Sequence, residues 1–127
     1  MLAALAIRDI VLIDRLEIDF APGMTVLTGE TGAGKSILLD ALALALGGRG
    51  DGALVRHGST QGQVSAVFDV PRDHPARALL SENAIDHDGE VILRRVQTAD
   101  GRTRAFVNDQ PVGVALLRDV GARLVEI

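Results

Sequence analysis

One stretch of the sequence combines residue types that can hold phosphate groups. It reads Gly29-Glu30-Thr31-Gly32-Ala33-Gly34-Lys35-Ser36, which fits the pattern of a glycine, four free positions and Gly-Lys-Ser known as Walker A. The glycines allow backbone angles at which successive N–H groups turn inward around phosphate oxygens. Lys35 would bring a positive charge to the outer phosphates, and the Ser36 hydroxyl would ligate a Mg²⁺ ion. The stretch therefore predicts a site for the phosphates of a nucleotide, ATP with Mg²⁺.

The residues on either side of this stretch are of the kinds that would position it. Residues 24–28 are apolar and β-branched and predict a buried strand, whereas residues 37–46 contain no Gly or Pro and predict a helix that Gly47 and Gly48 end. Strand, glycine loop and helix is the arrangement that supports the motif. A plain glycine-rich turn is the alternative, but it leaves the Lys-Ser pair, with the only lysine of the chain, unexplained. Because residues 37–46 are apolar on nearly every side, we expect that helix to be enclosed between layers.

The remainder of the chain predicts more strands than helices. Strands connected by hairpins differ from the alternating strands and helices of a doubly wound kinase. They suit an ATPase lobe in which an antiparallel sheet lies beside the phosphate-loop core. We expect strands over 5–13, 16–20, 63–70, 90–97, 104–107 and 124–127, helices over 76–83 and 113–123, and turns near 14–15, 86–89, 100–101 and 108–111.

The composition of the chain excludes several kinds of protein and of binding site. A chain of 127 residues fits one domain, and its aromatic content of 2% requires an aliphatic core. The absence of cysteine excludes disulfides and thiolate metal sites and is compatible with the cytoplasm. The net charge of −4 argues against strong electrostatic binding of DNA by this segment alone. The predicted helix over 37–46 is too short to cross a membrane, and the apolar N-terminus lacks the basic leader of a signal peptide, so we expect no membrane partner.

The run from Thr28 to Leu42 resembles the start of the ATPase head in SMC-like proteins of the ABC class that act in bacterial DNA repair (SMC stands for structural maintenance of chromosomes). Matching segments lie at 5–9, 54–58, 104–108 and 124–127, so the resemblance extends over nearly the whole chain. It implies an α/β P-loop NTPase fold of the ABC/SMC head type. The N-terminal lobe of such a head has a mixed and largely antiparallel sheet around one buried helix.

The resemblance also implies how the head is divided. Residues 1–127 would form the N-terminal lobe of a head split in sequence. A Gln loop, a coiled coil and a C-terminal lobe with the Walker B acid, the catalytic Glu and the signature motif would follow. Two heads would close on two ATP molecules as a homodimer. The complete, nucleoid-associated protein would act on DNA in double-strand break repair and recombination, and this lobe alone would be inactive.

The motif and the resemblance together define the expected site. Lys35 is the expected catalytic residue and Ser36 the expected Mg²⁺ ligand. Arg56 lies where related heads carry a basic residue near nucleotide or DNA, and a solvent-exposed surface arginine is the alternative. In the first strand, Asp9-Ile10-Val11 departs from the Asn, aromatic, basic pattern of many relatives, which removes the basic residue that could contact phosphate there. The expected nucleotide-binding residues are Gly29, Glu30, Thr31, Gly32, Ala33, Gly34, Lys35, Ser36, Ile37 and Arg56.

Other charged groups have two interpretations each. Arg94, Arg95 and residues 102–104 could contact a nucleic-acid backbone, or they could form a solvated sheet face. Residues 86–89 fit the Asp-x-x-Gly spacing of GTPases but are more typical of a hairpin turn. The three histidines lie far from one another, with no Cys or carboxylate at ligand spacing, and are expected in loops or in solvent.

Two further functions compete with an SMC-like ATPase lobe. A small P-loop phosphotransferase would share the phosphate loop, but it needs alternating strands and helices and a lid with further basic residues. A nucleotide-binding interaction module without catalysis would bind nucleotide with no change in its assembly state.

Overall fold

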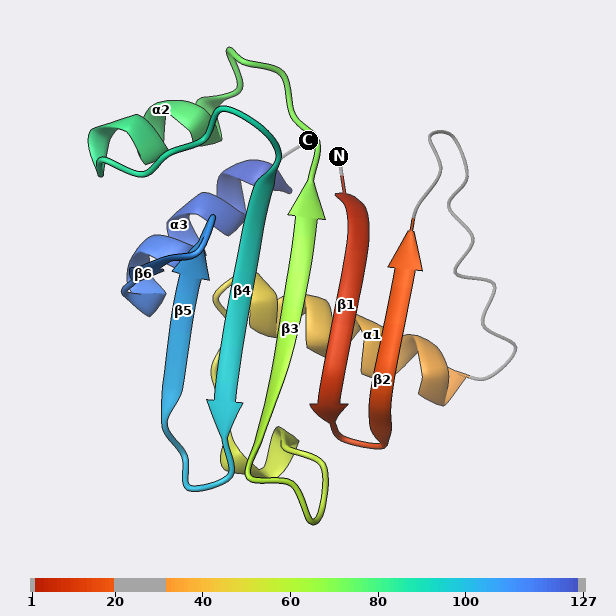
Figure 1. Cartoon of the computed structure of the whole chain (residues 1–127). Helices are drawn as coiled ribbons and strands as arrows, with labels where there is room; N and C mark the ends of the chain where they lie inside the picture. The colour runs from red at the N-terminus through yellow and green to blue at the C-terminus, as the bar shows by residue number, and fades with distance from the viewer. Residues whose placement is uncertain (1, 20–31, 126–127) are drawn as a thin grey trace.

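The computed structural model describes residues 2–19 and 32–125, and for residues 32–36 it describes the backbone alone. Strands dominate this part of the chain, as the sequence predicts. Figure 1 shows one sheet with helices packed behind it and at its end. The elements in chain order are β1 (Leu2–Ile10), β2 (Ile13–Asp19), α1 (Gly32–Ala45), the 3₁₀ turn η1 (Gly52–Leu54), β3 (Gln61–Phe68), α2 (Pro75–Glu82), β4 (Val91–Thr98), β5 (Thr103–Val107), β6 (Gln110–Val112) and α3 (Val114–Leu124).

The six strands form one sheet in the order β2-β1-β3-β4-β5-β6. Every pairing between them is antiparallel. The largely antiparallel sheet is therefore confirmed, while the strand expected over 24–28 lies outside the described residues. Within the described ranges the strands do not alternate with helices as a small phosphotransferase requires, and this disfavours that function.

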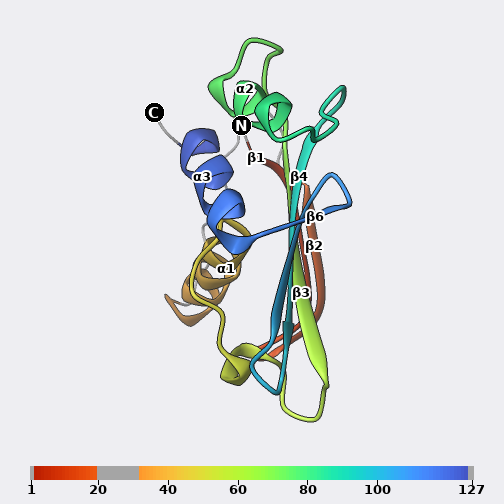
Figure 2. The same ribbon diagram turned by 90° about the vertical axis from the view of Figure 1, so that its left-hand side faces the viewer.

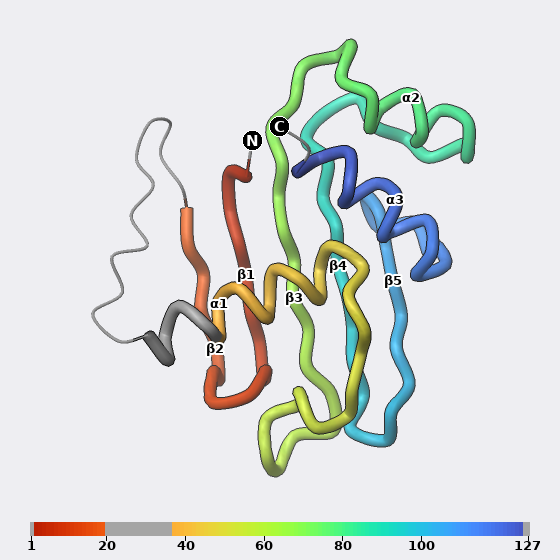
Figure 3. The backbone as a smooth tube through the Cα atoms, turned by 180° about the vertical axis from the view of Figure 1, so that it is seen from behind, coloured from red at the N-terminus to blue at the C-terminus, as the bar shows by residue number. Residues whose placement is uncertain are grey.

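The helices α1 and α3 cover one face of the sheet (Figure 2), and α2 lies near the ends of β3 and β4 (Figure 1). Figure 3, from behind, shows α1 crossing the sheet from the side of β2 toward β4. Side chains along a strand alternate between the two faces. The inward set under the helices is aliphatic, as the low aromatic content predicts, and includes Leu5, Ile7, Val64, Ala66 and Leu93, each at most 4% exposed.

The helix α1 is buried along one side only. Ala41, Leu44 and Ala45 are at most 2% exposed, whereas Leu39 is 56% exposed. The expectation of a helix enclosed on nearly every side is not met within the described residues, because no second layer covers its outer side there. The helix begins at Gly32, earlier than the predicted 37, and ends just before Gly47 as predicted.

The turn between the first two strands was expected near residues 14–15, and this expectation is wrong. The apolar run from Ile10 to Ile13 suggests one continuous strand, but Ile10 pairs with Ile13 across a tight turn. Val11 has a positive φ of 52°, and Leu12 at the tip is 82% exposed. Sequence patterns predict turns from polar residues, glycine and proline, so a turn with a hydrophobic residue at its tip is not detected.

Three expectations for the second half of the chain are also wrong. Residues 86–89 form no hairpin and instead connect α2 to β4. Asn108 and Asp109, with φ values of 48° and 66°, make a two-residue hairpin turn into β6 rather than a turn into a helix. Leu124 is the last residue of α3 rather than the start of a strand.

Candidate nucleotide-binding site

The predicted phosphate loop is described in part. Gly29, Glu30 and Thr31 lie outside the described residues. The backbone of residues 32–36 forms the first turn of α1, so the predicted helix after the glycines is confirmed. The side chains of Lys35 and Ser36 are outside the description, and their roles toward phosphate and Mg²⁺ stay predictions. Ile37 is half-buried on the same helix.

The start of α1 has the electrostatic character that a phosphate group needs. The first N–H groups of a helix have no partner within the helix, and the N-terminus carries about half a positive elementary charge. The first turn of α1 contains no acidic residue. Since no carboxylate of this turn competes for these N–H groups, the residues present fit a bound triphosphate.

The other end of α1 is closed by its own backbone. Gly47 has a φ of 98°, which favours glycine. Its N–H donates to the Leu44 carbonyl at 3.2 Å, and the Gly48 N–H donates to the Ala43 carbonyl at 2.8 Å. This is the Schellman pattern of a helix C-terminus. The two glycines that predict the end of the helix therefore form the structure that ends it.

Arg56 follows η1 and lies next to the turn between β1 and β2. Its N–H donates to the Asp9 carbonyl at 2.8 Å, and its guanidinium lies 3.8 Å from the Asp9 carboxylate and 3.5 Å from that of Asp14. The side chain is 43% exposed. Two carboxylates thus offset its charge, and no described residue of the phosphate motif is among its ion-pair partners. A contact with nucleotide or DNA stays a prediction.

The arginines grouped on the hairpin of β4 and β5 do not act as one set. Arg94 stacks on Phe106, 4.1 Å from the ring centre, and Arg102 pairs with Asp100 at 2.8 Å. A hydrogen bond from Thr98 and the pair with Arg102 lower the pKa of Asp100 to about 2. Arg95 is 1% exposed, so both interpretations are wrong for this residue: it lies neither on a solvated sheet face nor where it could contact a nucleic-acid backbone.

Arg95 instead contacts the C-terminus of α1, a role that sequence reasoning missed. Along β4 the buried positions alternate, and the pattern that buries Val91 and Leu93 also buries Arg95 and Gln97. That alternation was the sequence signal that could have predicted the burial of Arg95. Arginine is seldom fully buried, and composition alone therefore favours an exposed Arg95.

Two of the three histidines, His74 and His87, form local hydrogen bonds. His74 caps α2, where its Nδ1 accepts a hydrogen bond from the Ala76 N–H at 3.1 Å. His87 Nε2 lies 2.6 Å from the Ser81 hydroxyl. His57 is exposed in the loop after Arg56.

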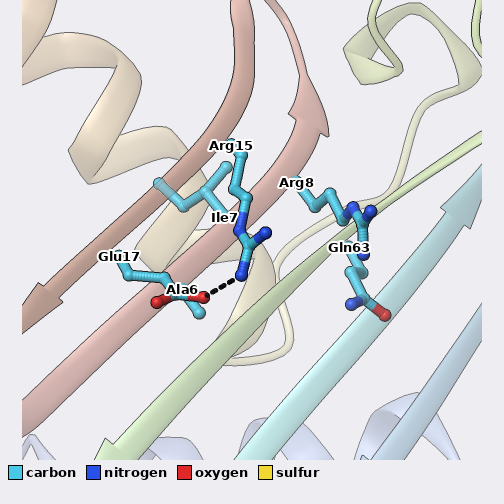
Figure 4. A pocket seen from close by; sticks show the side chains of 6 residues that line it. All are labelled: Ala6, Ile7, Arg8, Arg15, Glu17 and Gln63. Carbon is cyan, nitrogen blue, oxygen red and sulfur yellow. Dashed lines mark hydrogen bonds and ion pairs between the residues drawn. The ribbon is translucent and has the colours of Figure 1, made fainter.

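A shallow pocket lies on the sheet where β2, β1 and β3 run side by side (Figure 4). Arg15 donates to Glu17 at 3.1 Å, and the side chains of Arg8 and Gln63 approach each other from neighbouring strands. None of its lining residues belongs to the predicted nucleotide-binding set. They are Ala6, Ile7, Arg8, Arg15, Glu17 and Gln63.

Among the helices in the described ranges, none is both long and apolar enough to cross a membrane.

Comparison with known proteins finds relatives for the whole chain. The model of the AAA domain family matches residues 4–109. The DNA repair protein RecN of Xylella fastidiosa (strain 9a5c) is 44% identical over 127 residues, which are 100% of this chain and 23% of that protein. The chain thus spans about a quarter of the length of the curated relatives that it matches.

Solved structures share its fold. A chain from the structure "Structural biochemistry of ATP-driven dimerization and DNA stimulated activation of SMC ATPases" has a TM-score of 0.73 and 23% identity, over 97% of this chain and 78% of that one. The recombination mediator protein RecF, in the structure of RecF-ATPrS, has a TM-score of 0.69 and 17% identity, over 92% of this chain and 29% of that one. At these identities the likeness shows the fold alone, which is that of an ATPase head.

Proposed function

This chain belongs to the AAA domain family, as the counterpart of the N-terminal segment of RecN-type DNA repair proteins, and on that premise we propose that it binds Mg-ATP as one lobe of an SMC-like ATPase head. The observation that carries the proposal is the Walker A motif at the start of α1, whose first turn contains no acidic residue.

Each residue of the motif has a task in this proposal. The backbone N–H groups of residues 29–34 surround the phosphates, with Ile37 continuing the helix that carries them. Lys35 places its ammonium on the outer phosphates, where it offsets negative charge as the terminal phosphate is transferred to water. Ser36 would hold Mg²⁺, which would supply positive charge next to the phosphates.

The remaining groups for hydrolysis would come from other polypeptide. We place the acid that holds the metal and the general base on the C-terminal lobe of the same head, and the signature motif on a second head. The relative whose structure is titled for ATP-driven dimerisation supports this arrangement, because its fold matches over 97% of this chain. The complete protein would act in the repair of DNA breaks, as the name of its RecN relatives suggests.

The central experiment measures Mg-ATP binding by calorimetry in the complete protein and in its Lys35→Ala variant. We expect the variant to lose most of its affinity and all ATP-dependent head pairing. Arg104→Ala removes one positive charge from an exposed position of β5 and serves as the matched control. Unchanged binding and unchanged pairing in Lys35→Ala would contradict the proposal.

A second measurement tests whether ATP hydrolysis needs groups from both lobes of the head. We expect the purified chain of residues 1–127 to hydrolyse ATP no faster than its own Lys35→Ala variant, because the proposal assigns the acid and the base to other polypeptide. Turnover at ordinary enzyme rates, lost in Lys35→Ala, would place all catalytic groups on this chain. Nucleotide binding with no effect on head pairing in the complete protein would favour the interaction module instead.

A further inference from the structure

A buried cation lies at the end of α1 opposite the phosphate motif. Arg95 projects from β4 toward the helices and is 1% exposed. Its Nη1 donates to the carbonyls of Leu44 at 3.1 Å and Gly48 at 2.8 Å, and its Nε donates to the Thr103 hydroxyl at 2.5 Å. Among the described residues no ion pair includes Arg95. Its burial is therefore compensated by backbone carbonyls rather than by a carboxylate.

Arg95 contacts one carbonyl in the last turn of α1, that of Leu44, and one in the segment just beyond the helix, that of Gly48. The last carbonyls of a helix lack partners in the helix and carry the negative end of its dipole. Arg118 on α3 adds a second contact, from its Nε to the Gly47 carbonyl at 3.3 Å. Two cations from separate elements, a strand and a helix, thus hold the same end of α1.

The loop after α1 packs directly against this contact. A side chain at Gly50 would collide with Oε1 of Gln97 and would lie 3.0 Å from Nη2 of Arg95. Burial lowers the pKa of Arg95, with Arg118 adding to the effect, but a guanidinium stays charged at neutral pH. The close packing of the glycine-rich loop therefore contributes to the burial of the Arg95 guanidinium.

The buried side of α1 packs on the sheet through apolar side chains. Ala41, Leu44 and Ala45 are at most 2% exposed, and Leu38, Leu42 and Leu46 pack, partly buried, against the same core. Apolar packing has no preferred direction, whereas the hydrogen bonds of Arg95 are directional. The bonds from Arg95 therefore define the position of the helix end more narrowly than apolar packing does.

We propose that Arg95 is a positioning residue for nucleotide binding, which fixes the C-terminus of α1 on β4 and thereby sets where the helix presents the phosphate loop. This inference rests on the proposed function. A helix of 14 residues is about 20 Å long. A tilt of about 3° at the held end therefore moves the other end by about 1 Å, a displacement that can cost about a hundredfold in reaction rate.

The test compares three variants of the complete protein. Arg95→Met removes the charge and the donors at similar length, Arg95→Lys keeps the charge with one donor group, and Leu93→Ala weakens the same strand without touching α1's carbonyls. The dissociation constant of Mg-ATP is measured by calorimetry well below each unfolding midpoint. We expect Arg95→Met to raise it at least tenfold, Arg95→Lys to raise it less, and Leu93→Ala to change it less than twofold.

Hydrogen exchange of the same variants reports on the helix end itself. The N–H groups of Gly47 and Gly48 donate to the end of α1, and we expect them to exchange faster in Arg95→Met than in Leu93→Ala. Wild-type affinity in Arg95→Met, or equal weakening in Leu93→Ala, would overturn the inference and leave the proposed function intact. Absence of nucleotide binding in the unaltered protein would remove both.

If Arg95→Met does not fold, Arg95→Lys and Arg118→Met take its place. Arg118 is exposed and makes one contact to the helix end, so its loss should be tolerated by the fold. We expect a twofold to fivefold rise in the dissociation constant for each. Unchanged affinity in both variants would overturn the inference.

Discussion

Arg77 shows what a single buried side chain does for the backbone around it. It projects from α2, is 7% exposed, and donates to the carbonyls of Val70, Pro71, His87 and Gly89. These carbonyls belong to the two loops that connect β3 to α2 and α2 to β4. One guanidinium therefore bonds carbonyls of both loops, including that of Pro71, which also accepts from the His74 N–H within its own loop at 3.1 Å.

Replacement of Arg77 by Met should loosen both loops at once. A buried carbonyl left without a donor costs about 1–3 kcal/mol, although some of these carbonyls would regain water. We expect a loss of about 3 kcal/mol in the local free energy of opening, measured as faster hydrogen exchange across α2. Arg72→Met, at an exposed position of the same loop, should change exchange little. Equal exchange in the two variants would show that the four hydrogen bonds contribute nothing net.

At the scale of elements, the close approach of α3 to the C-terminal end of α1 depends on two glycines: Gly47, where a Cβ would lie 2.5 Å from the Arg118 Cα, and Gly121. A Cβ at Gly121 would lie 2.7 Å from the Leu46 carbonyl oxygen, which belongs to backbone and cannot move aside freely. In an ordinary helix, Gly to Ala stabilises by about 1 kcal/mol. At position 121, helix propensity favours alanine, whereas the packing between the helices favours glycine.

We predict that Gly121→Ala destabilises the pair of helices in spite of the higher helix propensity of alanine. The expected result is faster hydrogen exchange in α3 and at the end of α1. Gly113→Ala is the matched control, because a Cβ at this N-terminal cap meets no atom within 4 Å. Slower exchange in Gly121→Ala would mean that propensity outweighs the contact.

The sequence predicts the elements better than their connections. The strands β3, β4 and β5 and the helix α1 follow from hydrophobic periodicity and from Gly47, because those signals are local. The turn at Val11 and Leu12 could not be predicted, since an apolar tip breaks the usual turn composition. The Walker motif predicts a candidate site, whereas the role of Arg95 depends on a contact between β4 and α1 that no local pattern encodes.

For the whole molecule, the outer side of α1 is the feature that the described chain leaves uncovered. Leu39 is 56% exposed there, although a leucine in a helix usually faces apolar neighbours. The chain spans 23% of the length of its RecN relative. We propose that the C-terminal lobe of the head covers this side in the complete protein, as the resemblance to SMC-like heads implies.

The substitution Leu39→Glu tests whether the C-terminal lobe covers the outer side of α1. In the isolated chain we expect a change in stability within about 0.5 kcal/mol, as for surface substitutions in general. In the complete protein we expect a loss of about 2 kcal/mol or more, since a charge would be buried between lobes. The unfolding midpoint by calorimetry gives both values. Equal effects in chain and complete protein would mean that the outer side of α1 stays in solvent.

The strand order has a consequence for synthesis on the ribosome. β1 pairs with β2 at once, but its other edge, where Ile7 meets Val64, stays open until β3 has been made. Because synthesis adds about 5–20 residues per second, the N–H and C=O groups of that edge stay unpaired for several seconds. An early hairpin with one open edge can pair with another nascent chain. The hairpin itself carries charged side chains, Arg8 in β1 and Arg15 and Glu17 in β2, and charges on an edge strand disfavour such pairing between copies.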